Sequence, residues 1–194
     1  RLNAMRIRHA CSLLLVTCVA LLQGSLSHLT LADECLRQGD AVGVFYVTKV
    51  AGAEHDGVDP GEQLCYRCRY GSRPMVMVFA RETGDRLTEL VRRIDCAVAD
   101  NHDASLKGLV TMVGDSTSDL KAQAESVAKA ASVKTVPVVV ASSPLTGPEN
   151  YKLPPGAAVT VVVAKDSQVV NTYTFDVDQI DVAAVMSDVK HILH

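Results

Sequence analysis

The residues that could do chemistry in this chain are two cysteines three positions apart. Cys65 and Cys68 form a Cys-x-x-Cys pair, with Arg67, Arg69 and Arg73 close in the sequence. Nearby positive charge lowers the pKa of a cysteine and favours the thiolate, which is the nucleophile in thiol–disulfide exchange. The pair is therefore the candidate catalytic site, and the chemistry it indicates is disulfide exchange with a protein thiol or disulfide partner.

Two other interpretations of the pair stay open. It can be a structural disulfide that stiffens the loop before the next strand. The lack of a predicted helix at the pair favours this, because a helix N-terminus is the usual source of thiol activation. The pair can also be half of a metal site, which His55, Cys96 or Cys35 would complete. No second Cys-x-x-Cys and no His-x-His pair occurs, so we predict no metal ion, and no motif indicates another cofactor.

The first residues have the pattern of a secretory signal peptide. Basic residues at Arg6, Arg8 and His9 precede an apolar run over residues 10–22, and Thr30-Leu31-Ala32 has the small residues of a cleavage site. We expect residues 1–32 to be removed, which leaves one domain over residues 33–194 in the periplasm or outside the cell. The apolar run is short of the ~20 residues that a membrane span needs, so no membrane association is expected after cleavage.

The composition describes an acidic protein with a large apolar content. The chain has 22 acidic and 19 basic residues, a net charge of −3 and no tryptophan, and 48% of its residues are hydrophobic. A protein that binds nucleic acid usually carries a basic patch or stripe, and none is visible here. We therefore expect no nucleic-acid partner, and a core built mainly from valine, alanine and leucine.

Four of the six cysteines lie after the predicted signal peptide. They are Cys35, Cys65, Cys68 and Cys96. Disulfides form in exported proteins, because these meet an oxidising compartment. The spacing alone cannot choose among the pairings, so a bridge from Cys35 to Cys96 that ties down the N-terminal end is one of the alternatives.

The Cys-x-x-Cys pair lies between two predicted strands. Residues 42–50 are rich in β-branched and aromatic side chains and predict a strand, and residues 51–63 contain the glycines and proline of a loop. After Pro74 comes the apolar run Met75 to Ala80, which has the length and flanks of a buried strand. A helix is predicted over residues 84–99, where apolar residues recur at the spacing of one helical face.

Strands and helices alternate along the rest of the chain. Strands are predicted over residues 106–113, 136–141, 158–164 and 169–175, with helices over 116–131 and 178–193 and a proline-rich loop over 142–156. This alternation predicts a mixed, mainly parallel sheet with helices on both faces. In that sheet we expect six apolar residues to lie in adjacent strands: Val76, Val78, Leu109, Val139, Val161 and Val163.

This order of elements resembles the thioredoxin-like fold, and in particular its peroxiredoxin and redoxin branch. That branch has an extra strand before the final hairpin, which residues 136–141 would supply. The polar turn Lys165-Asp166 followed by Val169-Val170 is similar to the family's hairpin. The resemblance covers residues 42–193 and implies an α/β fold of the thioredoxin-like type.

The sequence departs from the family at the usual active site. In thioredoxins the Cys-x-x-Cys lies at the start of the helix after the first core strand, and the matching positions here hold Gly84 and Leu87. The peroxiredoxin threonine is matched by Thr83, but Arg86 stands where the cysteine should be. We expect this turn to be chemically silent.

Taken together, these observations predict an exported thioredoxin-like domain. If it is an enzyme, it is a thiol–disulfide oxidoreductase that uses the displaced pair Cys65 and Cys68. The alternatives are a non-catalytic thioredoxin-fold binding module with a structural disulfide, and a metal-binding accessory protein.

Overall fold

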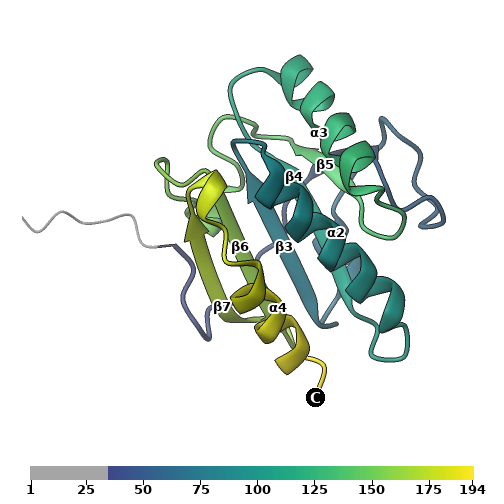
Figure 1. Cartoon of the computed structure of the whole chain (residues 1–194), viewed down its shortest axis with the longest axis vertical. Helices are drawn as coiled ribbons and strands as arrows, with labels where there is room; N and C mark the ends of the chain where they lie inside the picture. The colour runs from purple at the N-terminus through teal and green to yellow at the C-terminus, as the bar shows by residue number, and fades with distance from the viewer. Residues whose placement is uncertain (1–34) are drawn as a thin grey trace, which may run out of the picture. The chain divides into compact units, whose positions relative to one another are not determined.

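The structure is a computed structural model and describes residues 35–194. A seven-stranded sheet forms its centre. The strand order is β2-β1-β5-β4-β3-β6-β7, and Figure 1 labels the five strands β3 to β7. The described residues belong to one of the two units of the chain, Asp33–His194. The predicted signal peptide, residues 1–32, lies outside them. The strands are β1 (Val47–Ala51), β2 (Gln63–Leu64), β3 (Met75–Ala80), β4 (Lys107–Met112), β5 (Val138–Ala141), β6 (Val159–Lys165) and β7 (Gln168–Phe175).

The middle of the sheet is apolar on both faces. Every side chain of β3 is at most 2% exposed, and β3 pairs with β4 on one side and β6 on the other. Such a continuous apolar run is typical of a strand that is covered above and below. The prediction that six valines and leucines lie in adjacent strands is confirmed, since they fall in β5, β4, β3 and β6.

The sheet is mixed, as predicted, but the expectation that it is mainly parallel is wrong. Only β3, β4 and β5 run parallel to one another. A parallel neighbour requires a long crossover, and the chain has one at each of these two steps, the helices α2 (Asp85–Asp100) and α3 (Thr117–Ala131). The strands β6 and β7 form a hairpin, and β1 runs antiparallel to both β2 and β5.

The helices α2, α3 and α4 (Val182–His191) cover the same face of the sheet (Figure 1). Ser116 caps α3, since its hydroxyl accepts the backbone N–H of Asp119. The predicted helix over 178–193 is shorter in the structure, because a 3-10 turn, η2 (Val177–Gln179), precedes the cap at Asp181. The apolar stripes predicted for α2 and α4 are buried: Leu87, Leu90, Val91, Ile94, Val98, Ile180, Val182, Val185, Val189 and Ile192.

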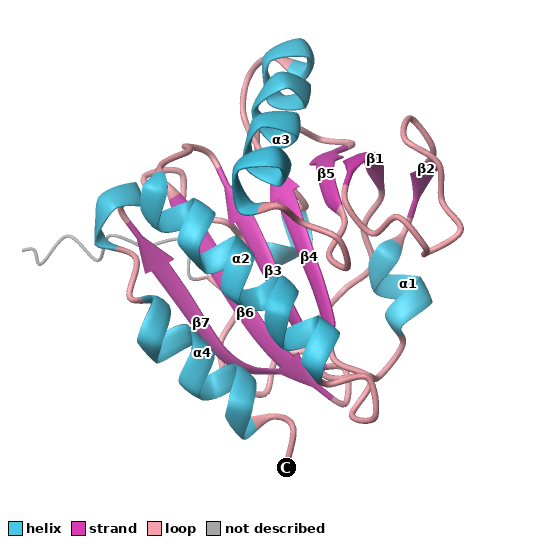
Figure 2. Cartoon of the chain, turned by 45° about the vertical axis from the view of Figure 1, so that its right-hand side comes forward, coloured by secondary structure: helices cyan, strands magenta, loops and turns pink. Residues whose placement is uncertain are grey.

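The other face of the sheet is covered by three short segments. These are the N-terminal segment up to Phe45, the helix α1 (Tyr66–Tyr70) and the 3-10 turn η1 (Glu149–Tyr151). Figure 2 shows α1 beside the short strands β1 and β2, away from the other helices. The sheet is therefore covered on both faces, with its long helices on one of them.

The strand predicted over residues 42–50 forms only in its second half. The backbone N–H of Val42 donates to the carbonyl of Ser167, beside β7, whereas Val47 pairs with Ala141 of β5. Residues 42–46 thus cross the sheet face from the β6–β7 hairpin to β1, and only Val42 and Tyr46, at the ends of the segment, form backbone–backbone hydrogen bonds. Phe45 fixes this crossing, because its ring lies 5.7 Å from that of Phe79 and 5.1 Å from that of Tyr151.

Within residues 35–194, no helix combines the length and the apolar character needed to cross a bilayer.

Candidate functional site

One helical turn holds the candidate dithiol. Cys65 and Cys68 are joined by a disulfide with an S–S distance of 2.11 Å and a Cα–Cα distance of 5.2 Å. Cys65 is the N-cap of α1, and Cys68 is the third residue of that helix. A turn of helix brings residues three apart to a separation that suits a disulfide. The expectation that the pair lies in a loop without a helix is therefore wrong.

Two tyrosines anchor α1, one to the loop between β1 and β2 and the other to the sheet. The hydroxyl of Tyr66 donates to Asp56 Oδ2 at 2.5 Å, and the hydroxyl of Tyr70 donates to the Gly108 carbonyl in β4 at 2.8 Å. The Tyr66 and Tyr70 side chains are buried. A helix of five residues is not stable in isolation. Its position therefore depends on these two anchors.

The arginines around the pair bind backbone carbonyls. Arg67 donates to the carbonyls of Val42 and Gly71. Arg73 donates to the carbonyls of Arg69 and Tyr70, at the C-terminal end of α1, where free carbonyls attract a cation. The positive charge that the sequence places near the cysteines thus also holds the helix in place.

The two sulfurs differ in their environment. Cys65 is 7% exposed, whereas Cys68 is exposed to solvent. The backbone N–H of Cys68 donates to Cys65 Sγ at 3.0 Å. Within residues 35–194 no donor contacts the sulfur of Cys68. The disulfide therefore has one sheltered, hydrogen-bonded end and one open end.

A buried ion pair lies beside the disulfide. Lys49 of β1 is 3% exposed, and its ammonium donates to Asp56 Oδ1 at 2.7 Å and to the carbonyls of Ala53 and Val58. All three donors of the ammonium are therefore satisfied, which a buried charge requires. The loop between β1 and β2 is folded around this lysine, and Asp56 connects it to Tyr66.

The contacts of Asp56 set the protonation state of this network. Burial alone would raise the pKa of Asp56, but hydrogen bonds from Lys49, Tyr66 and the Val58 N–H, with the charge of Lys49, hold it below its usual value. Burial and the bond to Asp56 raise the pKa of Tyr66 well above its usual value. Near neutral pH the network is an ionised carboxylate that accepts from a neutral phenol.

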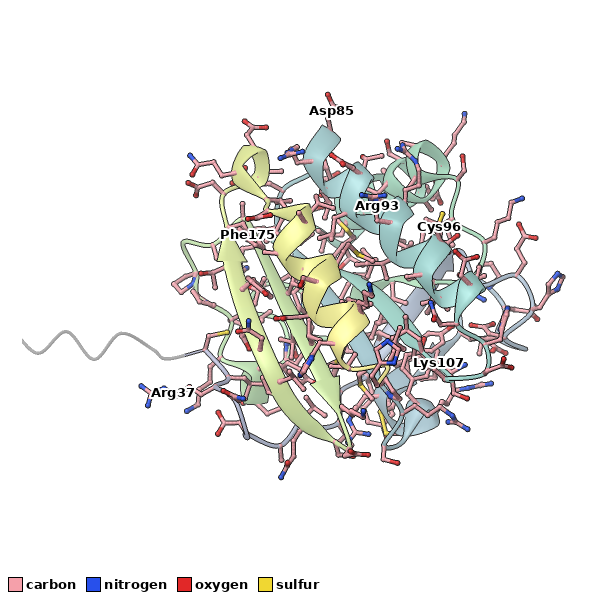
Figure 3. The ribbon with its side chains drawn as sticks, turned by 60° about the horizontal axis from the view of Figure 1, so that its bottom comes forward. Arg37, Asp85, Arg93, Cys96, Lys107 and Phe175 are labelled. Carbon is pink, nitrogen blue, oxygen red and sulfur yellow. A yellow bond between two sulfur atoms is a disulfide. The ribbon has the colours of Figure 1, made fainter. Side chains whose placement is uncertain are left out.

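The other two cysteines in the described residues are free thiols. Cys35 is half-buried near the carbonyl of Tyr151, and burial raises its pKa. Cys96 is exposed on α2 (Figure 3). The bridge from Cys35 to Cys96 is absent. Tyr151 packs on the face opposite to α2, so the two thiols belong to different faces of the sheet.

The metal interpretation gains no support from the described residues. His55 is exposed, and both Cys65 and Cys68 are used in the disulfide. No group of three or more histidine, cysteine, aspartate or glutamate side chains that could hold a metal ion lies in residues 35–194.

The turn after β3 lies at the opposite end of that strand from the disulfide. Gly84 is the N-cap of α2, Leu87 is fully buried, and Arg86 forms an exposed ion pair with Glu89 at 2.9 Å. The residues of β3 separate α1 from this turn. At about 3.3 Å per residue, six residues place roughly 20 Å between them.

A large open cavity lies at the C-terminal ends of the parallel strands β3 and β4, on the side of the turn after β3. Its volume is about 1010 Å³, and it is lined by the segments that follow β3, β4 and β5. The carboxyl ends of parallel strands are where α/β proteins commonly bind ligands. Among the residues that line it are Arg81, Asp115, Asp119, Gln123, Leu145 and Lys152, and no cysteine is among them.

Sequence reasoning located the cysteines but missed the structure around them. The helix α1, the strand β2 and the roles of Lys49 and Asp56 were not predicted. One signal was present: Tyr66 and Tyr70 are four residues apart, the spacing of one helical face. The partners of both tyrosines lie far from them along the chain, so the sequence alone gave no indication of where the helix would dock.

Comparison with known proteins identifies the fold. No protein-family model matches the sequence, and no curated protein matches it. Solved structures do match. One, assigned as the thiol:disulfide interchange protein DsbE of Chlorobium tepidum, has a TM-score of 0.59 and 12% identity over 82% of this chain and 99% of that chain.

Two further matches have the same architecture. AhpC of Mycobacterium tuberculosis has a TM-score of 0.56 and 14% identity, over 81% of this chain and 93% of that chain. The exposed lipoprotein thioredoxin of Streptococcus pneumoniae has a TM-score of 0.53 and 17% identity, over 77% of this chain and 99% of that chain. The chain therefore has the thioredoxin-like fold, as the sequence predicted.

Proposed function

We propose that this thioredoxin-like domain exchanges disulfides with protein thiols through Cys65 and Cys68. The observation that carries the proposal is the disulfide on α1, in which Cys68 is exposed to solvent while the sulfur of Cys65 accepts a backbone N–H. Exchange requires a thiolate to reach one sulfur of a disulfide, and the exposed end allows this. The thiol:disulfide interchange protein among the similar structures supports the same chemistry.

The test is reduction of insulin with dithiothreitol as the source of electrons. Wild-type protein should accelerate the reaction, and the variant with both Cys65→Ser and Cys68→Ser should not. Cys96→Ser is the matched control, since it removes an exposed thiol outside the proposed site, and it should retain the wild-type rate. If the double variant kept the activity, the proposed site would be wrong.

A non-catalytic binding module is the second candidate, and the shelter of Cys65 favours it. In that case the wild-type protein should show no turnover. The double serine variant should instead lose stability, by less than the ~2–4 kcal/mol that is typical of larger disulfide loops. A thermal melt of the two proteins, run beside the insulin assay, separates the two functions.

We also propose that the domain is exported, a setting in which disulfides form and persist. The signal-peptide pattern of residues 1–32 supports export, and the lipoprotein thioredoxin among the similar structures is described as exposed. N-terminal sequencing of the exported protein should find a start at or near Asp33. A mature product that retains residues 5–32 would contradict this.

A further inference from the structure

The two sulfurs of the disulfide are not equivalent, and the difference decides which one meets the partner. We propose that Cys68 is the sulfur attacked by the incoming thiolate and that Cys65 is the leaving and resolving thiol. This inference rests on the proposed exchange activity and assigns a separate role to each cysteine. Cys65 is 7% exposed, whereas Cys68 is exposed to solvent.

Access favours attack at Cys68. In thiol–disulfide exchange the attacking sulfur approaches along the S–S axis, on the side opposite to the leaving sulfur, and the rate depends on access to the sulfur attacked. An approach to Cys68 comes from solvent. Cys65 is only 7% exposed, so an incoming thiolate has less access to it.

The hydrogen bonding favours departure of Cys65. Its Sγ already accepts the N–H of Cys68 at 3.0 Å. When the S–S bond breaks, charge develops on the leaving sulfur, and a hydrogen bond to a charged acceptor is stronger than one to a neutral acceptor. A stabilised thiolate is the better leaving group. Since no donor in residues 35–194 contacts Cys68 Sγ, Cys68 lacks this stabilisation.

The reaction then runs in two balanced steps. A partner thiolate attacks Cys68 Sγ, a partner–Cys68 disulfide forms, and the electron pair of the broken bond leaves on Cys65 as a thiolate. A second thiolate of the partner attacks the partner's own sulfur in this mixed disulfide, which closes the partner disulfide and releases the Cys68 thiolate. Two electrons have moved from the partner to the protein. In the reverse direction Cys68 attacks a partner disulfide, and Cys65 resolves the mixed disulfide.

The first measurement uses the oxidised protein without any change in the active pair. The Cys35→Ser, Cys96→Ser protein is exposed briefly to reduced glutathione, and free thiols are then blocked in acid. Trypsin cleaves after Arg67, between the two cysteines, so the peptide masses locate the glutathione adduct. The adduct is expected on Cys68, and an adduct mainly on Cys65 would overturn the assignment.

The second measurement traps the partner. In the same background, Cys65→Ser leaves Cys68 as the only thiol of the pair, and Cys68→Ser leaves Cys65. The Cys65→Ser variant should react with a disulfide reagent at least about tenfold faster than the Cys68→Ser variant, because its thiol is exposed. It should also accumulate a mixed disulfide with oxidised insulin, whereas the Cys68→Ser variant should not.

The outcomes separate this inference from the function on which it rests. If wild-type protein reduces insulin and the complex accumulates on the Cys68→Ser variant, the order of the two cysteines is wrong while the proposed function stands. If wild-type protein neither reduces insulin nor takes up glutathione, the proposed function fails and the inference fails with it.

Discussion

Several polar contacts beside the disulfide meet at Asp56. One carboxylate oxygen accepts from the buried ammonium of Lys49, and the other accepts from the hydroxyl of Tyr66. The oxygen that accepts from Lys49, Asp56 Oδ1, also accepts the backbone N–H of Val58. This bond lies within the loop between β1 and β2. Because its charged form is hydrogen-bonded in the folded state, the pKa of Asp56 lies below its usual value.

The lowered pKa of Asp56 makes its contribution to the stability of the fold depend on pH. A group whose pKa is lowered on folding stabilises the protein fully above its unfolded pKa, about 3.9 for an aspartate. The contribution is lost as the pH falls through the lower, folded-state pKa. Removing a donor to Asp56 should therefore cost most near neutral pH and least in acid.

We predict that Tyr66→Phe will destabilise the protein by about 1.5–3 kcal/mol near neutral pH, the usual range for a hydrogen bond to a charged group. The loss should shrink as the pH falls through the acid range. Urea unfolding at a series of pH values measures it.

Tyr70→Phe is the matched control for this prediction. Its hydroxyl donates to a neutral carbonyl, that of Gly108. The change should cost about 0.5–1.5 kcal/mol, the usual range for a neutral hydrogen bond, with little dependence on pH. A loss in Tyr66→Phe that is equally large in acid would mean that Asp56 is not the group responsible.

At the scale of elements, a single carboxylate on α2 organises the connection between α3 and β5. Asp95 is 8% exposed and accepts the backbone N–H groups of Lys134, Thr135 and Val136, as well as the hydroxyl of Thr135. These donors precede β5 and have no ladder partner there. A helix on one face of the sheet thus fixes the entry of the chain into a strand.

We predict that Asp95→Ala will lower the free energy of unfolding by on the order of 3 kcal/mol, since it leaves buried backbone donors without an acceptor. Chemical denaturation measures the loss. Asp100→Ala, at the exposed end of the same helix, should change stability by about 0.5 kcal/mol or less. Similar losses in both variants would show that helix propensity, and not the bonds to residues 134–136, is responsible.

At the scale of the whole molecule, residues 42–46 connect the β6–β7 hairpin at one edge of the sheet to β1, next to the other edge, across one face. Neighbouring residues in this segment have opposite environments: Phe45 is 7% exposed and Tyr46 is 61% exposed. The ring of Phe45 packs against Phe79 of the central strand and against Tyr151. The segment thus covers a face of the sheet that lacks the long helices.

We predict that Phe45→Ala will destabilise the protein by about 3–5 kcal/mol, through lost burial and the cavity left behind. Tyr46→Ala should stay within about 0.5 kcal/mol of the wild type, as expected for an exposed site. Thermal or urea unfolding of the pair is the measurement. Comparable effects at both positions would contradict the crossing of residues 42–46 over the sheet face.

These environments explain which parts of the fold the sequence could predict. The bounds of β3 and the buried stripe of α2 follow from local patterns, an apolar run after Pro74 and apolar residues at helical spacing. Residues 42–46 have the composition of a strand, but they cross the sheet face, so only Val42 and Tyr46 at the ends of the segment bond to another part of the backbone. Which strands lie side by side is a property of the whole fold, and composition does not encode it.

The candidate site also combines features that the sequence could predict with features that it could not. The Cys-x-x-Cys spacing marked Cys65 and Cys68 as the candidate site, but it left a redox pair, a structural disulfide and a metal site as alternatives. The helix that carries it was not predicted, because five residues are too few to show a period and their conformation depends on Asp56 and Gly108. The exposure of Cys68 and the shelter of Cys65 follow from that docking, so the sequence could not distinguish the two sulfurs.

The position of Cys96 has a practical consequence. It is an exposed thiol on α2, and α2 packs on the face of the sheet opposite to that covered by α1. A maleimide linker or a fluorescent dye attached there would leave the Cys65–Cys68 face unobstructed. The molecule therefore carries its own attachment point for immobilisation, oriented so that a tethered protein presents its disulfide to the solution.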